Sequence, residues 1–97
     1  MEEVQQLFDE KGKGSFFILD GKEQIALMAV GVSGNLLTAF HTEVQPKAGG
    51  KGYAKKLLTA MTDYARKNNL KVKPLCPYVH AQFKRNGDAY KDLWNGD

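Results

Sequence analysis

The chain contains very little cysteine and histidine, and no long apolar run. Its one cysteine, Cys76, excludes an internal disulfide framework and indicates a reducing compartment. One cysteine and two histidines that lie far apart, His41 and His80, argue against a structural zinc site. No apolar run approaches the roughly 18 residues of a membrane span, and the acidic start MEEVQQLFDEKGKG lacks the apolar core of a secretory signal. We therefore predict a cytoplasmic protein with no metal ion and no membrane partner.

Basic residues are few in the first part of the chain and concentrated in the middle. Residues 1–43 contain three lysines and seven acids, a net charge of −4, whereas residues 44–73 contain eight basic residues against Asp63, a net charge of +7. Residues 74–97 contain three of each kind. Such a cluster favours a polyanionic partner, although a solvated lysine face is the ordinary alternative.

The length of 97 residues, with no repeat or linker, predicts a single domain over residues 1–97. The first elements expected are a helical turn at 4–10 with Leu7 and Phe8 inward, followed by strands at 15–19, 24–32 and 36–44. A helix from Gly52 and a strand at 70–75 come next. The chain then forms a helix at 78–86 and a last helical turn in DAYKDLW. The fold class is therefore α/β (α+β). An antiparallel β-meander is followed by a strand–helix–strand unit with parallel strands, and then by a C-terminal helix.

Turn and breaker residues support these boundaries. Asp20-Gly21 is typical of a tight hairpin turn, and Pro46 should end strand pairing near Val44. Pro74 removes a ladder hydrogen bond, so the strand at 70–75 should pair at its start and then diverge. The helix after Gly52 carries one apolar stripe, formed by Ala54, Leu57, Leu58, Met61, Tyr64 and Ala65.

The stretch PKAGGKGYA places three glycines where that helix should begin. The first amide groups of a helix have no internal partner and carry the positive end of the helix dipole. Gly49, Gly50 and Gly52 would let a diphosphate lie on these amides, with Lys47 and Lys51 at the rim; a flexible loop is the alternative. The spacing matches neither a P-loop nor a Rossmann fingerprint.

The sequence resembles the GNAT superfamily of N-acetyltransferases. Residues 47–52, KAGGKG, match the family's pyrophosphate loop Gln/Arg-x-x-Gly-x-Gly/Ala, except that Lys47 replaces Gln or Arg. The chain is most similar to a small, single-domain GNAT-like family. The shared residues are HTEV at 41–44, Leu57-Leu58, Tyr64-Ala65-Arg66, Leu70-Lys71-Val72, Pro74, Cys76-Pro77, Val79, Lys84-Arg85 and Tyr90. Asn86-Gly87 stands where relatives often have His-Pro.

The resemblance implies an acetyl-CoA-dependent N-acetyltransferase that acts on an amine. It implies splayed parallel strands between which pantetheine inserts, held by backbone groups near Glu43 and Val44. It also implies cofactor contacts on the loop and, less specifically, at Lys84 or Arg85. The cofactor-binding residues expected for acetyl-CoA or CoA are Val44, Lys47, Ala48, Gly49, Gly50, Lys51, Gly52, Tyr53 and Lys84.

Two residues are candidates for catalysis. Cys76 precedes Pro77, which is preferred at the first position of a helix, so the sulfur should lie at a helix N-terminus that favours thiolate. It could carry the acetyl group, or it could be an inert core residue. Glu43, at a strand end, could act as general base, or it could be an ordinary exposed glutamate. His41 and His80 are weaker candidates.

Two other functions remain open from the sequence. One is a non-catalytic CoA-binding module, since so short a chain has little surface for an acceptor pocket. The other is a nucleic-acid-binding domain, disfavoured because only Tyr53 interleaves the lysines for base stacking. The sequence predicts a monomer and does not identify the amine, which could be a small molecule or a peptide; Tyr78, Tyr90 and Trp94 are possible wall residues.

Overall fold

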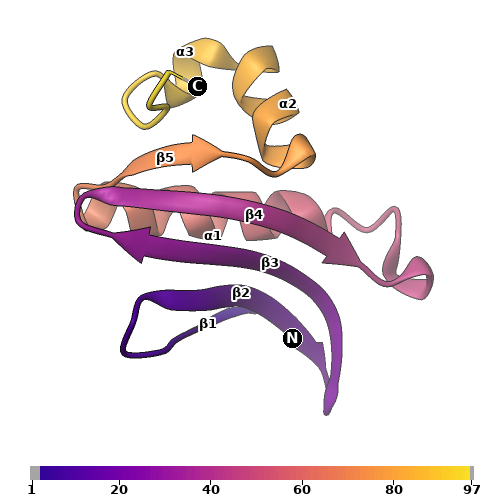
Figure 1. The fold of residues 1–97 in the computed structure, drawn as a ribbon. Helices are drawn as coiled ribbons and strands as arrows, with labels where there is room; N and C mark the ends of the chain where they lie inside the picture. Colours follow the sequence, from indigo (N-terminus) through magenta and orange to yellow (C-terminus); the bar gives the residue numbers. More distant parts are fainter. Residues whose placement is uncertain (1–2, 97) are drawn as a thin grey trace.

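A computed structural model describes residues 3–96, which form one sheet with the strand order β1-β2-β3-β4-β5 (Figure 1). β1 to β4 are antiparallel neighbours, and β5 pairs parallel to β4. The elements are β1 (Val4–Phe8), β2 (Lys13–Asp20), β3 (Glu23–Ser33), β4 (Leu36–Val44), the short 3₁₀ helix η1 (Pro46–Ala48), α1 (Tyr53–Lys67), β5 (Lys71–Pro74), α2 (Pro77–Arg85) and α3 (Gly87–Tyr90). The predicted meander and strand–helix–strand unit are confirmed.

The helical turn expected at residues 4–10 is wrong, because this segment forms the edge strand β1. Val4 and Phe8 are four residues apart, a spacing that places them on one face of either a helix or a strand. Phe8 lies 5.2 Å from the ring of Tyr64 and 5.9 Å from that of Phe16, centroid to centroid. Leu7, expected inside, is 69% exposed. Pairing with β2 therefore decides between two conformations that the apolar pattern allowed.

The core lies between the sheet and α1, which runs behind the sheet in Figure 1. Leu57, Leu58 and Met61 of α1 are fully buried in one cluster with sheet residues such as Met28 and Leu37. α1 ends as expected, with Asn69 in the left-handed region at φ 56°. No helix of the described chain covers the other face of β1–β4 in Figure 1.

The chain end covers the outer edge of β5. Val72 donates its N–H to the carbonyl of Leu93 at 2.7 Å and accepts from the N–H of Asn95 at 3.1 Å. Leu93 is buried and Trp94 is half-buried, so these residues anchor the chain end as predicted. α2 packs against β4, β5 and α3.

An exposed ion pair ties this chain end to α1. Arg66 Nε donates to Asp92 Oδ2 at 3.0 Å, and this bond lowers the pKa of Asp92. Because the folded pKa is depressed, the pair stabilises the fold above the unfolded pKa and loses this effect as the pH falls through the folded pKa.

We expect Asp92→Asn to lower the free energy of unfolding by less than about 1 kcal/mol at neutral pH and to remove this acid dependence. Urea unfolding at neutral and acidic pH measures both effects. If wild type and variant lose the same stability between the two pH values, the predicted acid dependence of the pair is wrong. The control is Asp88→Asn, a nearby acid for which residues 3–96 supply no ion pair.

Candidate active site

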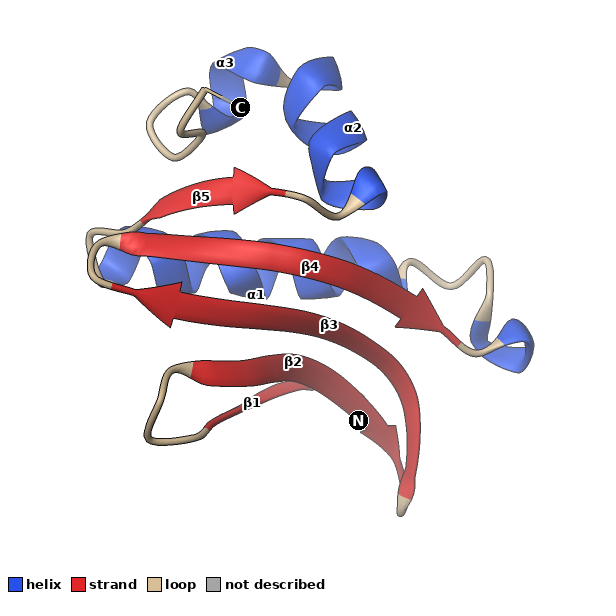
Figure 2. Cartoon of the chain, viewed as in Figure 1, coloured by secondary structure: helices blue, strands red, loops and turns tan. Residues whose placement is uncertain are grey.

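The two parallel strands diverge where the sequence predicted. β4 and β5 are paired only from Leu36 with Lys71 to Ala39 with Pro74. The N–H of Cys76 then bonds to the carbonyl of Ala39 at 2.8 Å, and the chain turns into α2. Figure 2 shows β4 continuing beyond the end of β5 toward η1. The edge of β4 from residue 40 to 44 is therefore left without a partner strand on this side.

The loop between β4 and α1 owes its shape to two glycines. Gly50 and Gly52 have φ values of 77° and 78°, a region that other residues rarely adopt. A Cβ atom at either position would meet no atom within 4 Å, so the space beside the loop is open. Gly49 is different, with an ordinary φ of −67°.

Two of the loop amides expected to bind a diphosphate already donate hydrogen bonds within the chain. The N–H of Ala48 donates to Gln45 O at 2.8 Å, and that of Gly49 donates to Pro46 O at 3.1 Å. These two amides close η1 and are not available to an anion in this conformation. The loop amides that can meet a phosphate therefore begin at Gly50.

No acidic side chain in the first turn of α1 offsets the positive charge at the N-terminus of this helix. Its first turn contains no acidic residue and includes Lys55 and Lys56, while Gly52 at the N-cap has no side chain to accept from the helix amides. The helix dipole adds partial positive charge at the same place. Lys51 is exposed just before it. This arrangement suits a polyanion that touches backbone amides.

Cys76 lies at the N-cap of α2 with Pro77 next to it, as predicted. Cys76 is only 1% exposed, and its Sγ lies 3.2 Å from Oγ1 of Thr42 on β4. The carbonyl of Cys76 accepts the N–H of His80 at 2.9 Å. Such burial is also what the inert-core alternative requires, and neighbouring side chains must move before a thioester can touch the sulfur.

Glu43 and His41 form a separate, exposed pair. His41 Nε2 lies 2.9 Å from Glu43 Oε2, and the two side chains are 52% and 70% exposed. They share one face of β4, as expected, but Thr42 between them faces the other way, toward Cys76. The structure therefore does not bring the two candidate catalytic residues together. Glu43 and Val44 instead line a cavity of about 240 Å³ with residues 24–27 and Pro46.

Comparison with known proteins agrees with this geometry. Residues 15–93 match the family model described as GCN5-related N-acetyltransferase. The chain belongs to this family. It is thus an N-acetyltransferase of the GNAT type, a class that generally uses acetyl-CoA.

Solved GNAT structures share this fold over two thirds or more of the chain. An NMR structure of a GCN5-like protein from Staphylococcus aureus is 30% identical, covers 100% of this chain and 93% of its own, and has a TM-score of 0.71. The ribosomal-protein-S18-alanine N-acetyltransferase of Escherichia coli is 19% identical, with a TM-score of 0.62 over 68% of this chain and 43% of its own. The ribosomal-protein-alanine N-acetyltransferase of Brucella melitensis biovar Abortus 2308 is 15% identical, with a TM-score of 0.65 over 91% of this chain and 65% of its own. No curated protein sequence matches.

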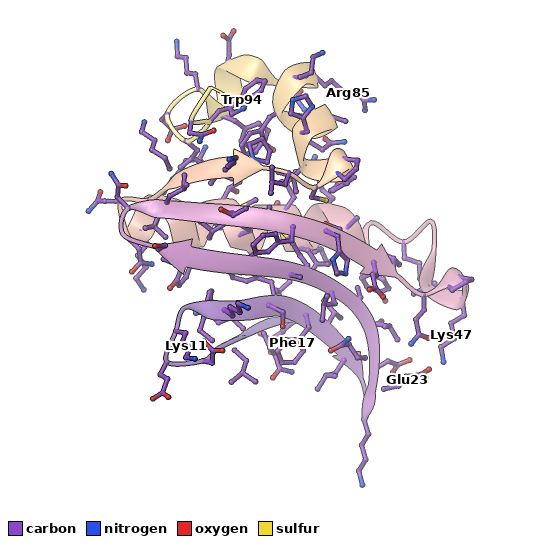
Figure 3. The ribbon with its side chains drawn as sticks, in the orientation of Figure 1. Lys11, Phe17, Glu23, Lys47, Arg85 and Trp94 are labelled. Atoms are coloured by element: carbon purple, nitrogen blue, oxygen red, sulfur yellow. The ribbon has the colours of Figure 1, made fainter. Side chains whose placement is uncertain are left out.

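Lys47, the first residue of the GNAT loop pattern, is held by an ion pair. Its Nζ contacts Oε1 of Glu23, the first residue of β3, and Figure 3 shows both side chains at the same end of the molecule. Both side chains are about half exposed. The charge expected at the loop is therefore shared with a carboxylate that sequence analysis did not connect to it.

Releasing Lys47 should strengthen binding of an anion at the loop. We expect Glu23→Gln to tighten acetyl-CoA binding by up to about five-fold, since an exposed ion pair is worth at most about 1 kcal/mol. Asp20→Asn, on the same hairpin, is the matched control and should change nothing. Calorimetric titration measures both; weaker binding in Glu23→Gln would mean that the pair shapes the loop.

Tyr78 was expected only as a wall residue, yet it lies half-buried in the first turn of α2, two residues after Cys76. Burial raises its pKa, and nearby Tyr90 and Cys76 raise it further. The phenol therefore stays protonated at neutral pH.

The remaining candidates lie elsewhere. Lys84 is in the last turn of α2, and its neighbour Arg85 lies far from Lys47 in Figure 3, so a contact of Lys84 with adenosine phosphates stays a prediction. The ring of His80 packs edge-on against Trp94 at 5.6 Å, a structural role. Residues 3–96 contain no group of His, Cys, Asp and Glu that could hold a metal ion, and none of their helices is long and apolar enough to cross a membrane.

Proposed function

We propose that this GNAT enzyme binds acetyl-CoA between β4 and β5 and transfers the acetyl group to an amine. The diphosphate lies on the amides from Gly50 into the first turn of α1, and the pantetheine arm follows the free edge of β4 at Glu43 and Val44. The observation that carries this proposal is the divergence of the two strands next to an uncompensated helix N-terminus. Extended backbone and amide donors meet there, as a pantetheine diphosphate requires.

Acetyl-CoA supplies an activated thioester, and we infer that Cys76 takes the acetyl group from it. The Cys76 thiol loses its proton and its sulfur attacks the carbonyl carbon, the bond from this carbon to the CoA sulfur breaks, and the departing CoA sulfur takes up one proton and leaves as a thiol. An amine then attacks acetyl-Cys76, loses a proton and releases the thiol. The position of Cys76 at the N-cap of α2 supports this role, since the first amides of a helix have no internal partner and face a group placed there.

Glu43 is proposed as the base for the amine, acting through a bridging water, because its side chain lies on the opposite face of β4 from the sulfur and does not contact the Cys76 thiol. Glu43→Gln should leave acetylation of Cys76 unchanged and slow the transfer to amine by about 10²-fold. The first rate is measured by intact mass, and the second by decay of the acetyl adduct with ethanolamine across neutral and mildly alkaline pH. An unchanged pH–rate profile would remove Glu43 from the reaction.

Calorimetric titration tests cofactor binding. Acetyl-CoA, ATP and a short oligonucleotide are compared at moderate salt. Saturable one-to-one binding of acetyl-CoA, clearly tighter than that of ATP, is the expected result. Equal weak binding of all three polyanions would mean that the loop only shapes a turn and that the lysines act as a general anion surface.

The cellular setting is part of the same proposal. A thiol that works as a nucleophile must stay reduced, which agrees with the predicted cytoplasmic location. The acceptor is an amine of a small molecule or a peptide, and the enzyme acts as a monomer.

A further inference from the structure

We propose that Thr42 is a positioning residue for Cys76: its hydroxyl holds the sulfur and donates a hydrogen bond to it as the thiolate forms. This inference rests on the proposed function, since it assigns a role in the reaction of Cys76 with a thioester. Thr42 Oγ1 lies 3.2 Å from Cys76 Sγ, within hydrogen-bonding distance for sulfur, and either atom can donate. The thiol can thus donate a hydrogen bond to the hydroxyl oxygen while at rest, and the hydroxyl can turn to donate one when the sulfur is charged.

A β-bulge in β4 is the reason that Thr42 meets the sulfur. Val30 pairs with Ala39, but the preceding Ala29 pairs with His41, so Phe40 has no partner on β3. The ring of Phe40 lies over Gly31 on the uncovered face of the sheet, where a Cβ at position 31 would come within 3.1 Å of it.

The extra residue shifts the alternation of side chains along the strand. After the bulge, Thr42 is opposite Met28, which is fully buried in the core, and shares the face of Ala39. In a regular strand, His41 would occupy this face instead, because side chains alternate with a period of two. The bulge thus aims an uncharged hydroxyl, rather than an imidazole, at Cys76.

The backbone of Cys76 is fixed on two sides. Its N–H donates to Ala39 on β4, and its carbonyl accepts from His80 on α2. The position of Sγ therefore depends on rotation about the Cα–Cβ bond, and a hydrogen bond to Thr42 selects one rotamer. His41 and Glu43, on the opposite face of β4, cannot do this.

The test compares three variants. Thr42→Val removes the hydroxyl at nearly constant shape, Thr42→Ser keeps it, and Thr38→Val changes another threonine of β4 that faces away from Cys76. We expect Thr42→Val to form acetyl-Cys76 about 10- to 100-fold more slowly, the size expected for one hydrogen bond to a charged group. Thr42→Ser should restore most of the rate, Thr38→Val should match wild type, and the Kd for acetyl-CoA should not change. Single-turnover intact mass gives the rates, and calorimetry gives the Kd.

Two outcomes would overturn the role of Thr42. Thr42→Val acetylated as fast as wild type would show that the hydroxyl is not used. Thr42→Ser as slow as Thr42→Val would show that the methyl group, through packing, is what matters.

Alkylation of Cys76 by iodoacetamide separates this inference from the covalent route. If wild type gains no acetyl group, the covalent route fails, but slower alkylation in Thr42→Val with recovery in Thr42→Ser still supports the contact. Faster alkylation in Thr42→Val would show that Thr42 only shields the sulfur, and the inference would fail while the covalent route stood.

Discussion

The Cys76→Ala protein is expected to gain no mass after incubation with acetyl-CoA, whereas wild type should gain one acetyl group. Turnover with an amine should fall by about 10³-fold or more, because the loss of a covalent nucleophile removes the step itself. Since Cys76 is the one cysteine of the chain, no second thiol can replace it. Intact mass at short times measures the adduct, and a thiol-release assay measures turnover.

Hydroxylamine provides the control for this experiment. It cleaves a thioester on cysteine but not an amide on one of the lysines, so an adduct that survives it is not on Cys76. Replacing a buried cysteine by alanine also leaves a small cavity, so the variant must be shown to unfold cooperatively. Retained turnover in a folded Cys76→Ala, with no short-lived adduct in wild type, would leave direct transfer from acetyl-CoA to the amine as the mechanism.

The Gly52→Ala protein is expected to bind acetyl-CoA at least about ten-fold more weakly, a loss of about 1.4 kcal/mol. Two causes act together. Residue 52 has a φ of 78°, where a Cβ costs about 1–2 kcal/mol. The Cβ would also occupy the open space through which a phosphate reaches the first amides of α1. Calorimetry gives the affinity, and urea unfolding gives the stability.

Gly34→Ala is a closely matched control. Gly34 has a φ of 60°, no atom lies within 4 Å of its ideal Cβ, and it sits in the β3–β4 turn at the other end of β4 from the loop (Figure 1). Both variants should lose similar stability, but only Gly52→Ala should lose affinity. Equal affinities for acetyl-CoA in the two variants would mean that Gly52 is needed only for the backbone conformation of the loop and not for cofactor binding.

Sequence patterns predicted most of the fold for clear physical reasons. Asp20-Gly21 marked the hairpin, although the two-residue turn between paired Asp20 and Glu23 is shifted by one, to Gly21 and Lys22. Pro74 predicted the divergence of the strands because it has no N–H to give. These signals are local, and local chemistry suffices to interpret them.

What sequence analysis missed depends on contacts between distant segments. Glu23 meets Lys47 across 24 positions, and Thr42 meets Cys76 across 34. Neither pair has a periodic signature. The bulge at Phe40 is likewise a property of two paired strands, since β3 decides which residue of β4 is left over. The candidate residues were therefore found singly, but their partners and the face on which each lies required the structure.

The bonds between Val72 and the chain end also affect how the molecule behaves in a concentrated solution. An open strand edge is a template on which another chain can add a strand. Here one such edge is occupied by residues 93–95 of the same chain, and Pro74 offers no N–H farther along it. A protein truncated before Leu93 would expose that edge and, with it, a route to intermolecular pairing and aggregation. The short C-terminal segment thus helps to keep one molecule from extending the sheet of another.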